Sequence, residues 1–341
     1  MTGPPTSLPL ARPCREADDE AILALLQSAF PKWPRVDIDV PAIDHLRWKL
    51  ASHPMAPTFT PVAEHNGEIA GVRLVMVRDV MFCGAPLLAY QAADISVHPT
   101  CRERGLLNRL VDIDYRGLDG RVAVQTFDLK LAYESRHPAV LRLQETIPGI
   151  FPLGNQLEAL SRPNTGSPAP APRIPTFAIR NVDGFDDRLD ALWRSASTAF
   201  DLICSRRKDV VNWRYADRRA GRFDITIAEH DGVLLGYVVI RCSRGRGYIA
   251  DLLVLPGRLD VASILVDHAL VSLQPHPLER IECWLPARHP YQELLRCAGF
   301  TARDSRLRLN YRPCIKTAQE LELLRDPNVR VHFTAGDTDL V

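Results

Sequence analysis

A carboxylate, an apolar strand and a basic turn follow one another in the middle of the first half of the chain. Asp94-Ile95-Ser96-Val97 is typical of a strand end, and Pro99 closes it. Arg102, Arg104 and Gly105 come next, and Leu106 opens an amphipathic helix. Free backbone N–H groups at a helix start, with a glycine and arginines beside them, suit a phosphate group. The stretch therefore predicts a phosphate-binding turn.

The same residues resemble a known cofactor loop. The run Val97-x-Pro99-x-x-Arg102-x-x-Gly105-Leu106 is similar to the acyl-CoA loop of the GNAT acetyltransferase superfamily, whose signature is Gln/Arg-x-x-Gly-x-Gly/Ala after a hydrophobic strand. Leu107 departs from the third fixed position and is closer to Eis-like members. The resemblance implies that acetyl-CoA or another acyl-CoA is the co-substrate. It also implies contacts to that co-substrate from Ile95, Ser96, Val97, Arg102, Arg104, Gly105, Leu106, Leu107, Asn108 and Ser135.

The chemistry that the resemblance implies is acyl transfer from a thioester to an amine, which needs a neutral nucleophile and a protonated leaving thiolate. Asp94 is the first candidate for the general base. A structural hydrogen bond is the alternative, because a corresponding Asp251 occurs later in the chain. The family's usual acid is a tyrosine in the helix after the fifth strand, and residues 141–145 contain none. Tyr133 is the nearest substitute, although a packed aromatic is the alternative.

Composition excludes several classes of protein. The chain has 341 residues, 46% of them hydrophobic and 24% charged, with a net charge of +1, which disfavours a nucleic-acid partner. Neither a membrane-spanning run nor a signal peptide is recognisable, so we expect a cytoplasmic protein. The eight cysteines are scattered without a Cys-x-x-Cys pair, which predicts reduced thiols and no metal site.

Local patterns predict how the site is supported. Asp18 or Asp19 can cap a helix that carries Ile22, Leu25 and Leu26 on one side. Asn66-Gly67 between apolar runs predicts a hairpin. After the basic turn we expect a buried strand over 122–127 and a short helix over 138–145. This order predicts an α/β fold in which helices cover a mixed sheet.

The second half of the chain repeats the first. Ala63-Glu64-His65-Asn66-Gly67 recurs as Ala228-Glu229-His230-Asp231-Gly232, and Trp48 recurs as Trp213, both displaced by 165 positions. We interpret this as a tandem duplication. The sequence thus predicts two tandem GNAT-like domains, each a mixed, mostly antiparallel sheet flanked by helices. The expected boundaries are 1–160 for the domain with the acyl-CoA loop, 161–176 for a proline-rich linker, 177–315 for a degenerate second domain and 316–341 for a C-terminal helix and strand.

The two copies differ in the loop. After Pro256 the second copy has no Arg-x-x-Gly turn, so the acyl-CoA site is assigned to the first copy. In the tail, 318–325 predicts a helix, and Val329, Val331 and Phe333 alternate as in a strand. Asp337 and Asp339 are interpreted as a solvated acidic turn.

These patterns predict an N-acyltransferase acting on an amine of a small molecule or peptide. A catalytically inactive acyl-CoA-binding or interaction protein is the alternative. An acyl carrier protein as donor also stays open, as do the acceptor's identity and the oligomeric state.

Overall fold

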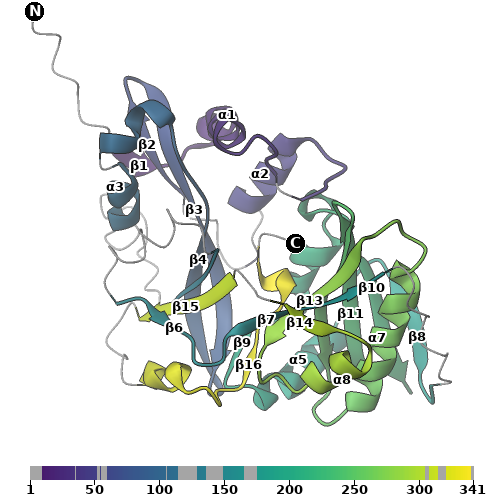
Figure 1. Cartoon of the computed structure of the whole chain (residues 1–341). Helices are drawn as coiled ribbons and strands as arrows, with labels where there is room; N and C mark the ends of the chain where they lie inside the picture. Colours follow the sequence, from purple (N-terminus) through teal and green to yellow (C-terminus); the bar gives the residue numbers. More distant parts are fainter. Residues whose placement is uncertain are drawn as a thin grey trace, which may run out of the picture.

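The computed structural model describes residues 10–34, 36–51, 54, 60–104, 106–113, 129–135, 149–164, 175–303, 307–313 and 320–338. Within them the chain builds two β-sheets (Figure 1). The first has the order β1-β2-β3-β4-β5-β15-β6, with β9 paired to the end of β3 and β16 paired to β9. Its strands are β1 (Leu10–Pro13), β2 (Pro61–His65), β3 (Glu68–Phe82), β4 (Ala85–Val97), β5 (Leu129–Ser135), β6 (Phe151–Pro152), β9 (Leu202–Cys204), β15 (Leu307–Pro313) and β16 (Val331–His332).

The second sheet has the order β14-β7-β13-β12-β11-β10-β8. Its strands are β7 (Leu157–Pro163), β8 (Ala178–Val182), β10 (Asp224–His230), β11 (Val233–Ser243), β12 (Arg246–Val254), β13 (Arg280–Pro286) and β14 (Thr301–Arg303). Most neighbouring strands are antiparallel, whereas β4–β5, β9–β16 and β12–β13 are parallel. Both sheets are therefore mixed and mostly antiparallel, as expected.

Helices cover both sheets. Those of the first sheet are α1 (Asp19–Ala29), α2 (Ala42–Ala51) and α3 (Leu106–Ile113), and those of the second are α5 (Arg188–Ala196), α6 (Lys208–Val211), α7 (Leu259–Leu273) and α8 (Gln292–Cys297). A π-helical turn spans Asn212–Ala216, and short 3₁₀ helices span Glu16–Asp18, Pro99–Arg104, Ser197–Ala199, Arg218–Ala220, Glu320–Arg325 and Ala335–Asp337.

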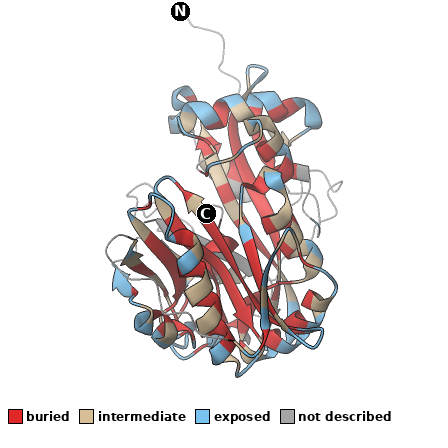
Figure 2. Cartoon of the chain, turned by 90° about the vertical axis from the view of Figure 1, so that its right-hand side faces the viewer, coloured by how far each residue is buried: buried red, intermediate tan, exposed pale blue. Residues whose placement is uncertain are grey.

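Alternation along β3 places the helices of the first sheet on opposite faces. Val72, Leu74 and Met76 share a buried cluster with residues of α1 and α2. Leu106 and Leu110 of α3 lie beside Gly71, where an added Cβ would come within 3.0 Å of Leu110. Because successive side chains on a strand point to opposite faces, α3 and the turn before it lie across the sheet from α1 and α2. Figure 2 shows the buried residues along the strands and the exposed ones on the outer helix faces.

Equivalent strands of the two sheets share their register. Gly71 pairs with Val97 in the first sheet, and Gly236 pairs with Val254 in the second. A bulge interrupts each pair of strands a few residues further on. The equivalent tryptophans meet where the two halves touch: the Trp48 and Trp213 rings stack 4.5 Å apart, and Trp48 Nε1 donates to the Trp213 carbonyl oxygen at 3.1 Å.

The strands are exchanged between the sheets. β9, β15 and β16 follow the proline-rich segment in sequence but complete the first sheet, while β7 precedes that segment and lies in the second sheet. Residues 161–163, which composition places in the linker, pair with β13 as the end of β7. Hydrogen bonding between strands determines which sheet each strand joins, and this pairing cannot be predicted from composition.

Local expectations had mixed outcomes. The Asn66-Gly67 hairpin is confirmed, with φ values of +53° and +82° at the two turn residues. Asp18 precedes α1 but makes no side-chain cap, because its carboxylate accepts from Arg12 instead. The expected strand over 122–127 and helix over 138–145 lie outside the described residues.

The tail also differs from expectation. A 3₁₀ helix covers Glu320–Arg325, and only Val331–His332 are strand. Asp337 is buried and paired with Arg206, so its interpretation as a solvated turn is wrong. Asp339 lies outside the described residues.

Candidate functional site

The parallel strands β4 and β5 pair only at their beginning. Ala89 pairs with Leu129 and Tyr90 with Lys130, and the structure gives no further pair between them although both strands continue. From Gln91 onward, this edge of β4 has no ladder partner among the described residues. Unpaired backbone donors and acceptors along a strand can bind an extended ligand. The two parallel strands therefore separate after Tyr90.

Asp94 sits at the bulge of β4. The register jumps between Val72–Ser96 and Leu74–Ala93, so Asp94 and Ile95 lie opposite a single residue of β3. The backbone of Asp94 is left-handed, with φ of +45°. Aspartate tolerates this region better than most residues, and bulges often lie beside functional sites.

The carboxylate of Asp94 forms a buried ion pair. Its Oδ2 lies 2.6 Å from Lys49 Nζ on α2, and the two side chains are 8% and 5% exposed. Burial raises the pKa of Asp94, but the Lys49 charge and hydrogen bonds from Lys49 and Trp33 outweigh it and leave the pKa below its ordinary value. A carboxylate in these contacts is a weak base in the unliganded protein.

The loop residues take different positions. Arg102 is exposed, and its Nε lies 3.4 Å from the Val97 carbonyl oxygen. Leu106 is fully buried against Ala63 and Ala70, so only its backbone can reach a ligand, and Leu107 is half-buried. Arg104 and Asn108 are placed by their backbone, in the turn and in α3, and Gly105 lies outside the described residues.

The edge strand and β5 hold the other candidates. Ser96 Oγ is buried and has no hydrogen-bond partner in the described part of the chain, while Ile95 and Val97 are half-buried. Tyr133 and Ser135 lie on β5 beyond its pairing with β4, and there they pair with Leu309 and Leu307 of β15. The splayed strands therefore carry the expected candidates on both sides of the opening.

The second domain places a different network at the same position. Asp251, equivalent to Asp94, has a fully buried carboxylate that lies 2.8 Å from Arg206 Nε and accepts from the hydroxyls of Tyr237 and Tyr215 at 2.9 and 3.2 Å. Burial raises the pKa of Asp251, but the Arg206 charge outweighs it and lowers the pKa well below its ordinary range. Arg206 also bonds Asp337 at 2.7 Å, which ties the C-terminal turn to this strand.

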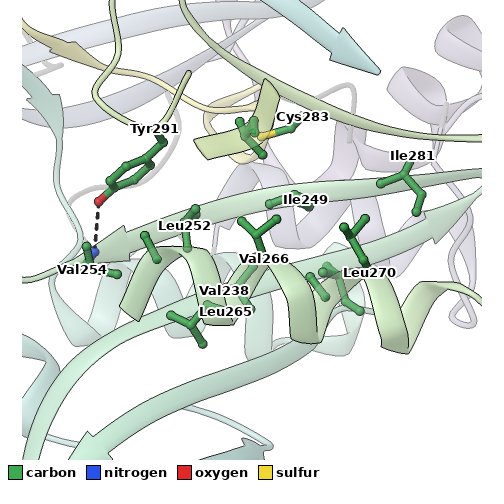
Figure 3. Close-up of a cluster of buried hydrophobic side chains, with 14 of the residues drawn as sticks. Val238, Ile249, Leu252, Val254, Leu265, Val266, Leu270, Ile281, Cys283 and Tyr291 are labelled. Atoms are coloured by element: carbon green, nitrogen blue, oxygen red, sulfur yellow. Dashed lines mark hydrogen bonds between the residues drawn. The ribbon is translucent and has the colours of Figure 1, made fainter. Parts of the chain in front are cut away.

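A tyrosine occupies the opening between the two parallel strands of the second domain. β12 and β13 pair from Arg246 to Ile249 and then diverge, as β4 and β5 do. Tyr291 lies at this opening, and its hydroxyl accepts from the Val254 N–H at 3.2 Å (Figure 3). Val254 of β12 is the equivalent of Val97 of β4. The Tyr291 hydroxyl therefore satisfies the Val254 N–H, at the position where the edge of β4 is open in the first domain.

Two small cavities lie on the α2 side of the first sheet. His45, Trp48, Lys49, Arg78, Arg214 and Thr338 contribute to one of them. The other is lined by Asp79, Cys204, Arg206 and Tyr215, and again by Arg78 and Arg214. Sequence reasoning did not single out His45, Lys49, Arg78 or Arg214. The repeat alone pointed to two of them, since Lys49 and Arg214 each follow one of the matched tryptophans, Trp48 and Trp213.

Two kinds of feature are absent from the described residues. They contain no group of three or more histidine, cysteine, aspartate or glutamate side chains arranged to hold a metal ion. Nor do they include a helix with the length and apolar character needed to cross a membrane.

Comparison with known proteins gives a family match for the first part of the chain. Residues 11–124 match the family model of the acetyltransferase (GNAT) domain. No curated protein matches the sequence.

Solved structures match nearly the whole chain. An Enterococcus faecalis protein of unknown function, described as a probable N-acyltransferase, has a TM-score of 0.64 and 12% identity over 90% of this chain and 73% of its own. A GCN5-related N-acetyltransferase from Anabaena variabilis has a TM-score of 0.65 and 11% identity with the same coverage. Another from Sphaerobacter thermophilus has a TM-score of 0.53 and 21% identity over 90% and 96%.

At these identities the solved structures establish the fold alone. Together with the two equivalent sheets, they confirm the predicted fold class. Residues 11–124 thus match the acetyltransferase (GNAT) domain, and the chain as a whole has an α/β fold of two GNAT-like domains.

Proposed function

We propose that this protein is an N-acyltransferase that moves an acetyl or other acyl group from acyl-CoA to an amine of a small molecule or peptide. The observation that carries the proposal is the open edge of β4 after Tyr90, which leads directly into the Arg102 turn and α3. Its backbone groups suit an extended pantetheine arm, and the turn before α3 suits the phosphates. The GNAT match over residues 11–124 covers both features.

The donor site belongs to the first domain alone in this proposal. Tyr291 occupies the corresponding opening of the second domain, and no Arg-x-x-Gly turn precedes α7. We also propose that the two domains arose by tandem duplication, which the shared register of Gly71–Val97 and Gly236–Val254 supports. On this view the second copy lost its donor site and became the support for the first, and Leu107 relates the remaining loop to Eis-like variants.

Two roles are open to Asp94 within the reaction. Its ion pair with Lys49 favours a positioning role, because the pair fixes the bulge that opens the β4 edge. Removal of the amine proton by Asp94, directly or through water, is the competing role, with Tyr133 on β5 as the candidate acid for the leaving thiolate. The reaction needs no oxidant or reductant: the amine nitrogen gains the acyl carbon, the thiolate leaves, and one proton passes from nitrogen to sulphur.

Steric blocking of the loop tests the donor site. Gly105→Trp places a bulky side chain where the family loop approaches the phosphates, so calorimetry should show at least a tenfold loss of acetyl-CoA affinity. The matched control is Gly257→Ser in the second domain, which stands before α7 and should leave the affinity unchanged. Unchanged affinity in Gly105→Trp would contradict the site, and equal losses in both variants would contradict its restriction to the first domain.

A further inference from the structure

Two buried histidines meet where the C-terminal segment contacts the second sheet. His332 is on β16, and His289 follows β13 in the sequence. Nε2 of His289 lies 3.0 Å from Nδ1 of His332. The Phe200 ring lies against both imidazoles, with 5.3 and 5.0 Å between ring centroids. The proposed acyl transfer gives this pair no role, so its chemistry has to be explained separately.

The hydrogen bonds around the pair determine which nitrogen of each imidazole carries the proton. The Tyr291 backbone N–H donates to His289 Nδ1 at 3.1 Å, so a neutral His289 carries its proton on Nε2. That proton is directed at His332 Nδ1, which is therefore the acceptor. His332 then carries its proton on Nε2, which lies 3.6 Å from Asp251 Oδ1. The pair is a chain of two neutral imidazoles that runs from a backbone N–H to a buried carboxylate.

A further proton has no place in this chain. The unprotonated nitrogens of the two imidazoles are both Nδ1 atoms, and each already accepts an N–H. A proton on His289 Nδ1 would point at the Tyr291 N–H, and a proton on His332 Nδ1 would point at the His289 N–H. Moving the proton along the chain only moves this conflict. Charging either imidazole therefore requires one of the two contacts to open.

Charged groups face the pair from several elements. Asp251 of β12 and Asp337 of the C-terminal turn are negative, and Arg206, which follows β9, is positive and pairs with both carboxylates at 2.8 and 2.7 Å. The neighbouring thiols and phenols are uncharged at neutral pH, because burial raises the pKa of each: Cys204, Cys283, Tyr215, Tyr237 and Tyr291.

These surroundings keep both imidazoles neutral at pH 7. Burial, followed by the neighbouring His332, lowers the pKa of His289 well below its ordinary value of 6.5. Burial also lowers the pKa of His332, although the hydrogen bond to Asp251 opposes it, and the Arg206 charge lowers the pKa further. Burial outweighs the two carboxylates, because a charged imidazole loses its hydration in a closed space.

The pair contacts a segment that is tied to both halves of the molecule. β16 has two residues, which pair with β9, and the C-terminal turn follows it (Figure 1). The Asp337 carboxylate pairs with Arg206, and the Asp337 carbonyl oxygen accepts from Arg78 of β3 at 3.3 Å. Arg214 donates to the Gly336 carbonyl oxygen at 2.9 Å. A change at β16 therefore reaches contacts on the first sheet.

We propose that the His289–His332 contact is an acid-sensitive latch, which holds residues 331–338 in place at neutral pH and opens when either imidazole takes up a proton. Val331 and Phe333 lie in the core cluster of the first sheet and do not titrate, so the opening is local. It changes the lining of both cavities, since Asp337 lines one and Thr338 the other. The latch does not depend on the proposed acyl transfer, because its test follows the backbone alone.

Hydrogen exchange at two pH values tests the latch. Because the folded pKa values are lowered, the closed form is fully favoured above the ordinary value of 6.5 and is lost as the pH falls below it. Between about pH 7.5 and about pH 5.5, each imidazole should favour the open form by about tenfold. After correction for the intrinsic pH dependence of exchange, we expect the protection of residues 331–338 in the full-length protein to fall by about 100-fold.

The core strand β11 is the internal reference for this measurement, and its protection should stay unchanged over the same range. Unchanged protection of residues 331–338 would overturn the proposal. So would an equal loss in β11, because it would show that the whole protein unfolds and that the latch has no separate opening.

Glutamine variants assign the effect to the two imidazoles. Glutamine stays neutral and can still accept and donate, so His289→Gln or His332→Gln should each reduce the loss of protection from about 100-fold to about tenfold. The double variant should abolish it. His230→Gln is the matched control, since His230 is an exposed histidine beside Asp231, and it should keep the full loss. If the double variant does not fold, either single variant decides: an unchanged 100-fold loss would refute the latch.

Discussion

Equivalent aspartates in the two domains have acquired different partners. Asp94 pairs with Lys49, whose repeat equivalent is Arg214, whereas Asp251 pairs with Arg206. Arg214 is thereby directed toward the cavity and the C-terminal turn. The second copy's equivalent of the lysine that holds the bulge therefore lines the cavities beside the first sheet.

Acid should destabilise the protein through both aspartates. Their pKa values are lowered in the folded state, so each contributes stability that is fully present above its unfolded value of about 4. That contribution is lost as the pH falls below about 4 toward the folded pKa. We expect the melting temperature to be flat with respect to these groups above about pH 5 and to drop below pH 4, measured by calorimetry in buffers of constant ionic strength.

Asp94→Asn distinguishes positioning from proton transfer. It leaves the Lys49 ammonium buried without its partner, which should cost about 3–5 kcal/mol of unfolding free energy and weaken the acid dependence. Asp251→Asn is the matched variant in the second domain. A general base would add a kinetic effect to this loss of stability: kcat of the folded enzyme would fall by about 10² to 10⁴ and recover in part at high pH, whereas a positioning role gives no such recovery.

Sequence could identify some of these residues and not others. Asp94, Arg102 and Gly105 can be identified from the sequence because the strand, the turn and the helix are contiguous. Arg78 and Lys49 cannot, since their partners Asp337 and Asp94 lie 259 and 45 positions away in the sequence. Buried contacts of this kind depend on the packing of α2 and the C-terminal turn against the sheet.

At the level of elements, the second domain fills with packed side chains the opening that stays free beside β4 in the first domain. α7 and α8 contribute Leu265, Val266, Leu270 and Leu295 to a core that also contains Ile249 and Val254 of β12 (Figure 3). Tyr291 completes this core and caps the free N–H of Val254. The Asn66-Gly67 hairpin, α1 and α3 were readable from turn residues and periodicity. The closing of the opening between β12 and β13 was not, because it depends on one hydroxyl that reaches the Val254 N–H.

Tyr291→Phe tests whether this hydroxyl is a structural substitute for a ligand. The change keeps the ring and leaves the buried Val254 N–H without an acceptor, so the unfolding free energy should fall by about 1–3 kcal/mol in urea titrations. Tyr248→Phe, which removes a hydroxyl nearer the other end of β12, should change it by less than about 1 kcal/mol. An equal effect of both substitutions would show that the Val254 contact contributes nothing specific.

At the level of the whole molecule, the strand exchange makes each half incomplete without the other. β15 pairs with all seven residues of β5, β9 pairs with the end of β3, and β7 joins β13 to β14. The C-terminal turn adds the Arg206–Asp337 pair to this connection. Two domains were predictable from the repeat and the proline-rich segment. The exchange was not, because short strands such as β9 and β16 have no periodicity to identify them.

If the chain is divided between residues 164 and 175, neither fragment should fold alone, whereas the two fragments together should form the complete protein. Fragment 1–164 lacks β9, β15 and β16, so β5 becomes an open edge and β7 loses its sheet. Fragment 175–341 lacks β7, which leaves β13 and β14 without the strand between them. Exposed strand edges promote aggregation. We expect each fragment alone to be insoluble, and the two co-expressed fragments to co-purify with one acetyl-CoA site per pair, measured by size-exclusion chromatography and calorimetry.

A soluble, monomeric 1–164 fragment that binds acetyl-CoA as the full chain does would show that the exchanged strands are dispensable, and that the second domain does not support the first.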